Sequence, residues 1–335
     1  MQARLSNIVF EKTLLGFLLH IELKKGEGMA RYILKRIAMM VVTVFVVTAL
    51  TFIMMRWMPG SPFNNPKLSA SQIAALSRQY GLDKPVLVQF WQYLVNALHF
   101  DFGTSYINTG QSVSLMIGQR LPVSMQLGFQ ALIVGVPLGM YVGTWQAMRK
   151  NTATDYSLSV VTLIFTALPD FLLAMLLMVF FAIDFPIFPI TGWDSWMSSV
   201  LPTLALGMGV IAFVARFTRS QTLETLDSDQ IQLAYAKGLN EGQVILKHAV
   251  RNSLIPVLTL LGPLTAGLLT GSALIETIYS IPGIGNQFVA SISSKDYPVI
   301  MGTTIVYTVM LQVMILIGDI ATAIADPRIR FGGNR

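Results

Sequence analysis

Three carboxylates lie in stretches of sequence that are otherwise apolar. Asp170 and Asp319 fall inside long apolar runs, and Glu276 falls near the end of a third. An ionised carboxylate at the centre of a bilayer costs at least about 2.5 to 3.5 kcal/mol, so we expect Asp170 and Asp319 to face the helix bundle or a water-filled cavity. The chemistry open to such groups is a proton relay, a gate or contact with a solute. All three are therefore candidates for a translocation path or gate.

Other reaction chemistry has little support in the sequence. The chain has no cysteine, which excludes disulfides, thiolate catalysis and thiolate metal sites. His20, His99 and His248 are far apart and have no metal-ligand spacing. No nucleophile, base and orienting group cluster together, and there is no G-x-x-x-x-G-K-[ST] phosphate loop. We therefore predict no catalytic residues, no metal site and no cofactor bound by this chain.

The composition places the chain in a membrane. Of its 335 residues 53% are hydrophobic and 12% are charged, whereas soluble domains carry about a quarter charged residues. A spanning helix needs about 20 mostly apolar residues. The fold class predicted is an all-α polytopic membrane protein, in which Pro169 and Asp170 kink or break the third span. The six predicted transmembrane helices cover residues 37–57, 121–147, 156–182, 200–217, 254–278 and 299–325.

The lysines and arginines predict the orientation. They gather before the first span, between the second and third, between the fourth and fifth, and after the sixth. By the positive-inside rule both termini are cytoplasmic, so topology explains the net charge of +6 without nucleic acid. The predicted divisions are an N-terminal extension 1–28, a first transmembrane helix 29–57, an external loop 58–120, a five-helix transmembrane core 121–325 with a cytoplasmic segment 218–253, and a tail 326–335.

Two further patterns concern packing. In the external loop we expect a short helix over Ser69–Tyr80 and an amphipathic helix over Pro85–Phe100, which either caps the outer mouth or lies on the membrane surface; the cap is slightly favoured. Gly135, Gly139 and Gly143 recur every fourth residue and form a flat ridge for a neighbouring helix. Static packing explains this ridge more simply than a moving interface does.

The cytoplasmic segment 218–253 is longer than a simple connection requires. It is predicted to form two short helices, of which the first begins near Asp227–Asp229 and stops at Gly238, while Asn240 caps the second. Its apolar residues exceed what a solvated loop needs. Docking into a groove of another protein and an ordinary structured loop are equally compatible with these residues.

Several strings in this order resemble a known family. Residues 233–256 (LAYAKGLNEGQVILKHAVRNSLIP) resemble the cytoplasmic coupling loop of ABC importer permeases of the dipeptide, oligopeptide and nickel type. Most of the chain from Met29 onward is similar to that family. The other strings are RYILKRI (31–37), PGSP (59–62), FDFGTSY (100–106), RLPVSMQLG (120–128), ETIYSIPGIG (276–285), KDYP (295–298) and DPRIR (326–330).

The resemblance implies a type I-like permease fold and a set of partners. In the family, two related permeases form the path, two cytoplasmic ATPases bind ATP and magnesium, and an external binding protein delivers peptide. It also implies contact with the ATPase. The residues implied for it are Gln232, Leu233, Ala234, Ala236, Lys237, Gly238 and Leu239. Glu-Ala-Ala, which opens the general ABC-importer loop, is replaced here by Gln232, Leu233 and Ala234, so no carboxylate ion pair is expected.

Alternatives to peptide import remain open. Within the same family the solute is a peptide, nickel or another small molecule. A proton-coupled secondary transporter would use Asp170 or Asp319 in a relay. A polytopic membrane enzyme is the third reading.

The N-terminal residues 1–28 have no counterpart in the family pattern. The codons of Lys24 to Gly28 must be purine-rich, and they stand directly before Met29 like a translated ribosome-binding site. We hypothesise that Met29 is the physiological start, which N-terminal sequencing of the native protein tests. The competing hypothesis is an amphipathic helix on the cytoplasmic membrane surface.

Overall fold

A computed structural model describes residues 29–57, 69–108, 110–244 and 250–325, and within these ranges the protein is helical. The elements are α2 (Met29–Trp57), α3 (Ala70–Gln79), α4 (Val86–Leu98), α5 (Val113–Met148), α6 (Ala153–Ala167), α7 (Asp170–Met178), the π-helix η1 (Val179–Asp184), α8 (Trp196–Leu226), α9 (Asp229–Ala236), α10 (Glu241–Val244), α11 (Val250–Ile278), α12 (Ile284–Ser294) and α13 (Tyr297–Ala325). The N-terminal extension 1–28, the PGSP string and the tail 326–335 lie outside the described residues.

Four helices are long and apolar enough to cross a membrane, namely α2, α5, α8 and α13. A fifth candidate is the pair formed by α6 with α7 and η1, which is bent by 101°. The bend lies where Pro169 and Asp170 predicted it, because Pro169 caps α7 and α6 ends at Ala167. The described chain is thus an all-helical membrane protein with four or five candidate spans. The fifth predicted span, 254–278, falls in α11, which is 29 residues long but is outside this set.

Two helices are longer than the hydropathy pattern predicted. Helix α5 begins at Val113 instead of Leu121 and continues for 36 residues through Pro122 and Pro137. Helix α8 runs for 31 residues, beginning after a capping box between Ser195 and Ser198. Hydropathy marks only the part of a helix that can sit in hydrocarbon, whereas the helix continues until its backbone is capped. Parts of the predicted external loop and cytoplasmic segment are therefore helical, as continuations of α5 and α8.

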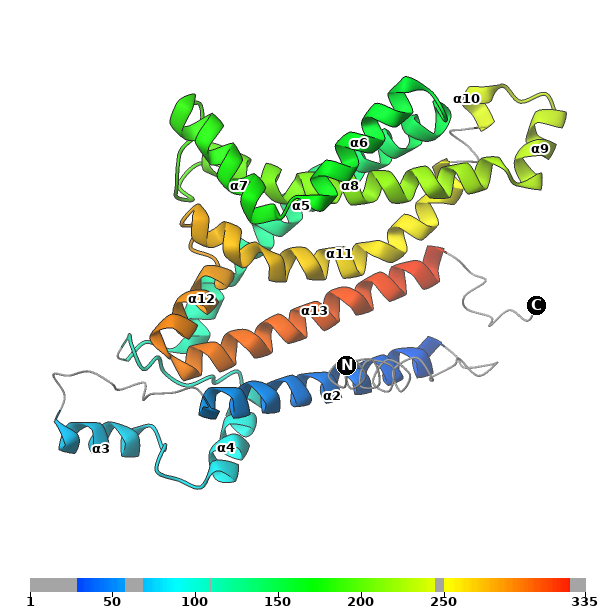
Figure 1. Ribbon diagram of the computed structural model, residues 1–335. Coiled ribbons are helices and arrows are strands. Elements are labelled where there is room, and N and C mark those ends of the chain that lie inside the picture. The colour runs from blue at the N-terminus through cyan, green and yellow to red at the C-terminus, as the bar shows by residue number, and fades with distance from the viewer. Residues whose placement is uncertain (1–28, 58–68, 109, 245–249, 326–335) are drawn as a thin grey trace, which may run out of the picture.

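Helices α2, α13, α11 and α8 lie one above another in Figure 1 and alternate in direction. We call the end that carries α9, α10, the start of α2 and the end of α13 the inner end. The opposite end, with α3, α4 and α12, is the outer end. The inner end carries the segment predicted to be cytoplasmic, so this arrangement matches the predicted alternation of loops.

The glycine ridge of α5 packs against α8. A Cβ atom added to Gly139 would lie 2.7 Å from Cβ of Val214, and one added to Gly143 would lie 2.3 Å from the carbonyl oxygen of Ala215. At Gly135 the nearest atom would be Cγ1 of Val210, also at 2.7 Å. The ridge therefore lets the two backbones approach as closely as the sequence predicted.

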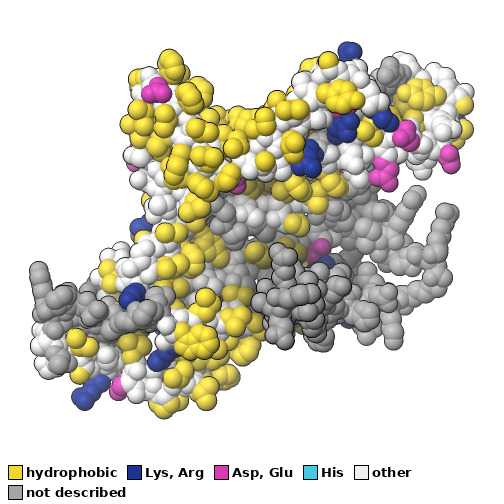
Figure 2. Space-filling view, in the orientation of Figure 1, with side chains coloured by type: hydrophobic (Ala, Val, Ile, Leu, Met, Phe, Trp, Pro, Cys, Tyr) yellow, Lys and Arg dark blue, Asp and Glu magenta, His cyan; other side chains and the backbone are white. Residues whose placement is uncertain are grey.

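Hydrophobic side chains cover much of the surface around α5 to α8 (Figure 2). Residues of α6 and η1 such as Leu163 and Phe180 are more than half exposed. At the outer end Phe90 of α4 packs against Phe45 and Phe52 of α2, with ring centroids 5.9 and 5.3 Å apart. The amphipathic helix predicted near residues 85–100 is therefore present, and it lies across the outer end of α2.

Candidate functional site

Helix α9 forms a small projection at the inner end. Asp229 lies in its first turn, and Gly238 ends it with φ of +81°. The amide N–H of Gly238 donates to Tyr235 O at 2.9 Å and that of Leu239 to Ala234 O at 3.3 Å, which is the Schellman pattern of helix termination. Gly238 thus stops the helix as its sequence predicted. The expected cap at the other end is different, because Ser228 Oγ donates back to Thr225 O at 2.6 Å.

The residues predicted to contact an ATPase divide between two faces of α9. Ala234 is only 5% exposed and packs with Ile231 and Val244, so it holds α9 against α10 instead of facing outward. The other predicted residues are exposed or half-buried: Gln232, Leu233, Ala236, Lys237, Gly238 and Leu239. Leu233 is 56% exposed, on the side of α9 away from buried Ile231 and Ala234. Tyr235, which the sequence interpretation omitted, is 47% exposed but points to a different side of the helix, since residues two apart do not face each other.

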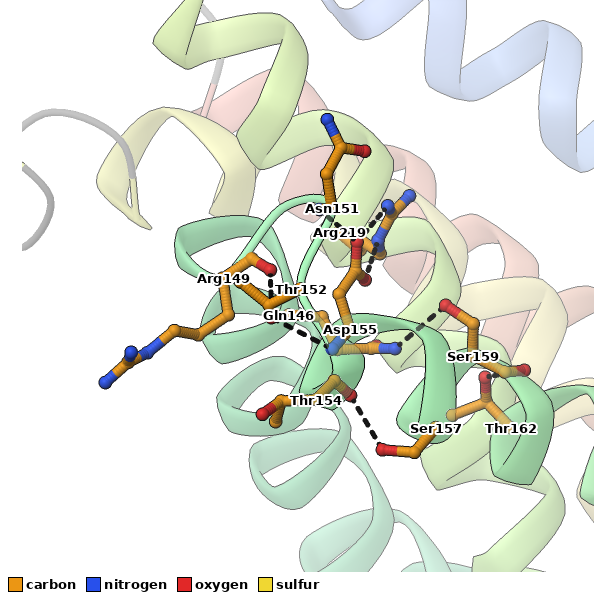
Figure 3. A network of polar contacts seen from close by, with 10 residues as sticks. All are labelled: Gln146, Arg149, Asn151, Thr152, Thr154, Asp155, Ser157, Ser159, Thr162 and Arg219. Carbon is orange, nitrogen blue, oxygen red and sulfur yellow. Dashed lines mark hydrogen bonds and ion pairs between the residues drawn. The ribbon is translucent and has the colours of Figure 1, made fainter.

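An ion pair joins α8 to the first turn of α6 (Figure 3). Nε and one terminal nitrogen of Arg219 each donate to Asp155 at 2.8 Å. The Asp155 side chain is 2% exposed and also accepts from the N–H of Asn151 at 3.1 Å, while Arg219 is 30% exposed. Arg219 lies about two turns before the end of α8, which leads directly into α9. The projection is therefore attached to the broken span through this pair, and neither residue was singled out from the sequence.

Asp170 lines a cavity of about 420 Å³ at the broken span. The other walls come from α6, α8 and α11, and include Phe165, Gly209 and Pro263. Asp170 is exposed, and its carboxylate has no hydrogen bond or ion pair within the described part of the chain. It stands in the first turn of α7 at the break, where an unwound backbone is tolerated only because it lines a cavity or packs on protein. The structure thus places this candidate beside open space.

Asp319 and Glu276 lie elsewhere. Asp319 forms an ion pair with Arg36 at 3.0 Å, which attaches the inner end of α13 to the start of α2. Its cost in hydrocarbon is reduced by this partner. Glu276 is fully buried and does not border the cavity lined by Asp170. The structure therefore brings none of the three candidates together.

Glu276 fastens three segments at the outer end. Its Oε1 accepts from the hydroxyls of Ser124 at 2.6 Å and Ser272 at 2.8 Å, and its Oε2 accepts from the N–H of Asn286 at 2.9 Å. A Cβ atom at Gly283 would lie 2.3 Å from Oε2, so the loop can close over the carboxylate only with glycine there. The loop between α11 and α12 is thereby fixed to α5.

A second outer contact joins two of the strings quoted above. Asp296, which is 2% exposed, accepts from the hydroxyl of Ser105 and, at 3.0 Å, from the N–H of Tyr106. The strings FDFGTSY and KDYP are therefore neighbours in space, although they are far apart in the sequence. Among the described residues no three His, Cys, Asp or Glu side chains come close enough to hold a metal ion.

These features define a multi-pass helical membrane protein with one broken span and a compact helical projection at one end. The C-terminal part, residues 135–331, matches the family described as binding-protein-dependent transport system inner membrane component, and residues 29–128 match the N-terminal part of such membrane components. The chain belongs to this family, which confirms the resemblance seen in its strings. It is accordingly a non-catalytic membrane subunit.

Individual relatives align over nearly their whole length. The dipeptide transport system permease protein DppB of Lactococcus lactis subsp. cremoris is 52% identical over 302 residues, which are 90% of this chain and 100% of the relative. DppB of Bacillus subtilis is 44% identical over 90% of this chain and 98% of its own length. The oligopeptide transport system permease protein OppB of Escherichia coli K12 is 36% identical, over 90% of this chain and 100% of the relative.

A solved structure shares the fold. The crystal structure of an amino acid ABC transporter with histidines superposes with a TM-score of 0.50 and 17% identity, covering 64% of this chain and 94% of the other. Helix arrangement is therefore similar over most of the permease core.

Proposed function

We propose that this chain is one of two membrane-spanning subunits of an ATP-driven importer that carries short peptides into the cell. The observation that carries the proposal is the 52% identity to a dipeptide permease along that relative's whole length. In this proposal six helices span the cell membrane, with α11 as the span outside the hydropathy set, and both termini are cytoplasmic. A second, related permease completes the path.

The geometry of the inner end supports the proposed partners. Two ATPases bind ATP and magnesium, and one docks on the exposed face of α9 where Leu233 offers apolar contact. An external binding protein delivers peptide to the outer end. Closure of the ATPases changes the permease between two states because they bind the two states with different affinity. Asp170 and its cavity lie on the path.

Uptake in cells tests the proposal against its alternatives. Cells that express the complete transporter should accumulate a radiolabelled dipeptide, and should lose this uptake when the ATPases cannot hydrolyse ATP. Uptake that survives the inactive ATPase but collapses with an uncoupler would indicate a proton-coupled transporter instead. Uptake of nickel without peptide would change the solute but keep the class.

Docking is tested on the same complex. Leu233→Asp places a charge on the exposed face of α9 and should abolish copurification of the ATPase while leaving the permease in the membrane. Ala234 is unsuitable for this test because it is buried, so a charge there would disturb α9 itself. Ala74→Asp, which adds the same charge at an exposed position of α3 at the opposite end, is the matched control and should copurify normally. Full copurification of the Leu233→Asp variant would refute docking at this face.

A further inference from the structure

The outer end of the protein contains a second cavity, which none of the sequence motifs predicted. It has a volume of about 490 Å³ and lies between α2, α4, the start of α13 and the segment 101–106. Pockets of 300 to 1,000 Å³ are the usual size for small-molecule sites. The walls come partly from the strings FDFGTSY and KDYP, whose mutual position is fixed by Asp296.

The cavity has a cation and an anion in its wall. Arg56, the penultimate residue of α2, is kept over the ring of Phe52 at 5.5 Å and donates to the side-chain oxygen of Gln89. Asp101 accepts from the N–H of Gly103 at 2.9 Å through one oxygen, and its other oxygen has no partner among the described residues. These contacts hold both side chains in place, and each side chain can still bind another charged group.

Between these charges the wall is aromatic. The rings of Tyr80 and Tyr106 are 4.5 Å apart, and Tyr297 lies 6.2 Å from Tyr106. Burial, and then the neighbouring Asp296 carboxylate, raise the pKa of Tyr106, so its phenol stays neutral. The hydroxyl of Tyr93, also in the wall, is buried without a hydrogen-bond partner in the described ranges. The wall thus combines flat apolar surface with an unused polar group.

We propose that this cavity binds a short peptide in its zwitterionic form, with Arg56 receiving the terminal carboxylate and Asp101 the terminal ammonium group. A guanidinium matches a carboxylate in a two-bond geometry, and a carboxylate accepts readily from an ammonium group. The tyrosines contact the side chains of the peptide. This inference rests on the proposed function, because it makes the outer cavity a site that the imported peptide occupies before it crosses the membrane.

Paired changes in ligand and protein test the assignment. The permease–ATPase complex is reconstituted in lipid nanodiscs without the binding protein, and binding of radiolabelled dialanine is compared with that of its N-acetyl and C-amide derivatives. Each derivative should bind the wild type at least about tenfold more weakly, since it loses a charge-assisted contact. Arg56→Gln should weaken dialanine similarly and become indifferent to amidation, while Asp101→Asn should become indifferent to acetylation.

Matched controls come from the same outer segment. Arg78→Gln and Asp83→Asn remove the same charges from exposed positions outside the cavity wall, and should leave all three affinities unchanged. Equal affinities of the wild type and both cavity variants would overturn the assignment. So would a phospholipid that copurifies with the wild type and is lost with Arg56→Gln.

Failure of this inference is separable from failure of the proposed function. Cells that take up dialanine with an unchanged KM in both variants retain peptide import and lose only the cavity assignment. Cells that take up no peptide at all lose both.

Discussion

Two buried carboxylates fasten opposite ends of this protein, and they do so with different partners. At the outer end Glu276 accepts from two hydroxyls and a backbone N–H, all neutral. At the inner end Asp155 is held by the two-bond contact with Arg219 and by one backbone N–H. Both carboxylates are nearly or fully buried, so burial alone does not separate the two ends.

The difference lies in how much each contact depends on its surroundings. The loop over Glu276 closes so tightly that Gly283 has no room for a Cβ atom, and three segments share the carboxylate. The inner pair depends on one long side chain that is 30% exposed to solvent. We infer that the outer cluster is a fixed part of the fold, whereas the inner pair can part and reform as α8 and α9 respond to a partner.

The largest expected effect comes from Glu276→Ala. It leaves the hydroxyls of Ser124 and Ser272 and the N–H of Asn286 without their acceptor, at a cost of about 1 to 3 kcal/mol for each buried group left unpaired. Little folded permease should then accumulate in membranes, as measured by immunoblot and by thermal unfolding of the purified complex. Asp194→Ala, at an exposed carboxylate near the same end, is the control and should behave as wild type. Normal abundance and melting of Glu276→Ala would show that the outer cluster is not a fastener.

The sequence predicted features that depend on one residue or a short stretch, and it missed features that depend on contacts between distant segments. The break at Pro169 and the end of α9 at Gly238 were predicted because a proline or a glycine acts on its own backbone. The four or five spans that the structure supports were predicted because hydropathy is local, although their ends were not, since α5 and α8 continue into the polar flanks.

The sequence did not predict which residues would contact the two buried carboxylates. Glu276 meets Ser124 across 152 positions and Asp155 meets Arg219 across 64, so only the packing of helices decides these pairs. Arg219 looked like one of several cytoplasmic basic residues, and Asp155 like the start of a span. Asp170 was expected to face the bundle or a water-filled cavity, and it lines a cavity; its role on a path stays a prediction.

Arg219→Lys is expected to reduce stability less than Glu276→Ala does. Its main effect should be on transport. An ammonium group cannot bridge both oxygens of Asp155, yet it keeps the charge, so the loss of stability should be about 1 kcal/mol for a partly exposed pair. Peptide uptake per permease molecule should fall several-fold while abundance stays near wild type, because α9 is held less firmly to the broken span. Arg216→Lys, at an exposed position of α8, is the matched control. A loss of abundance as severe as that of Glu276→Ala would remove the distinction between the two ends.

The smallest expected effect is a change of melting temperature with salt, which compares the inner ion pair directly with the outer cluster. The screening length falls from about 10 Å at 0.1 M salt to about 3 Å at 1 M, and ions reach the exposed part of Arg219. The difference in melting temperature between the wild type and Asp155→Asn should therefore narrow by roughly 1 °C on going from low to high salt. The difference between the wild type and Glu276→Gln should stay constant, since neutral donors surround that carboxylate. Equal salt responses would mean that the outer carboxylate interacts with a cation, and that the two ends are held by the same kind of force.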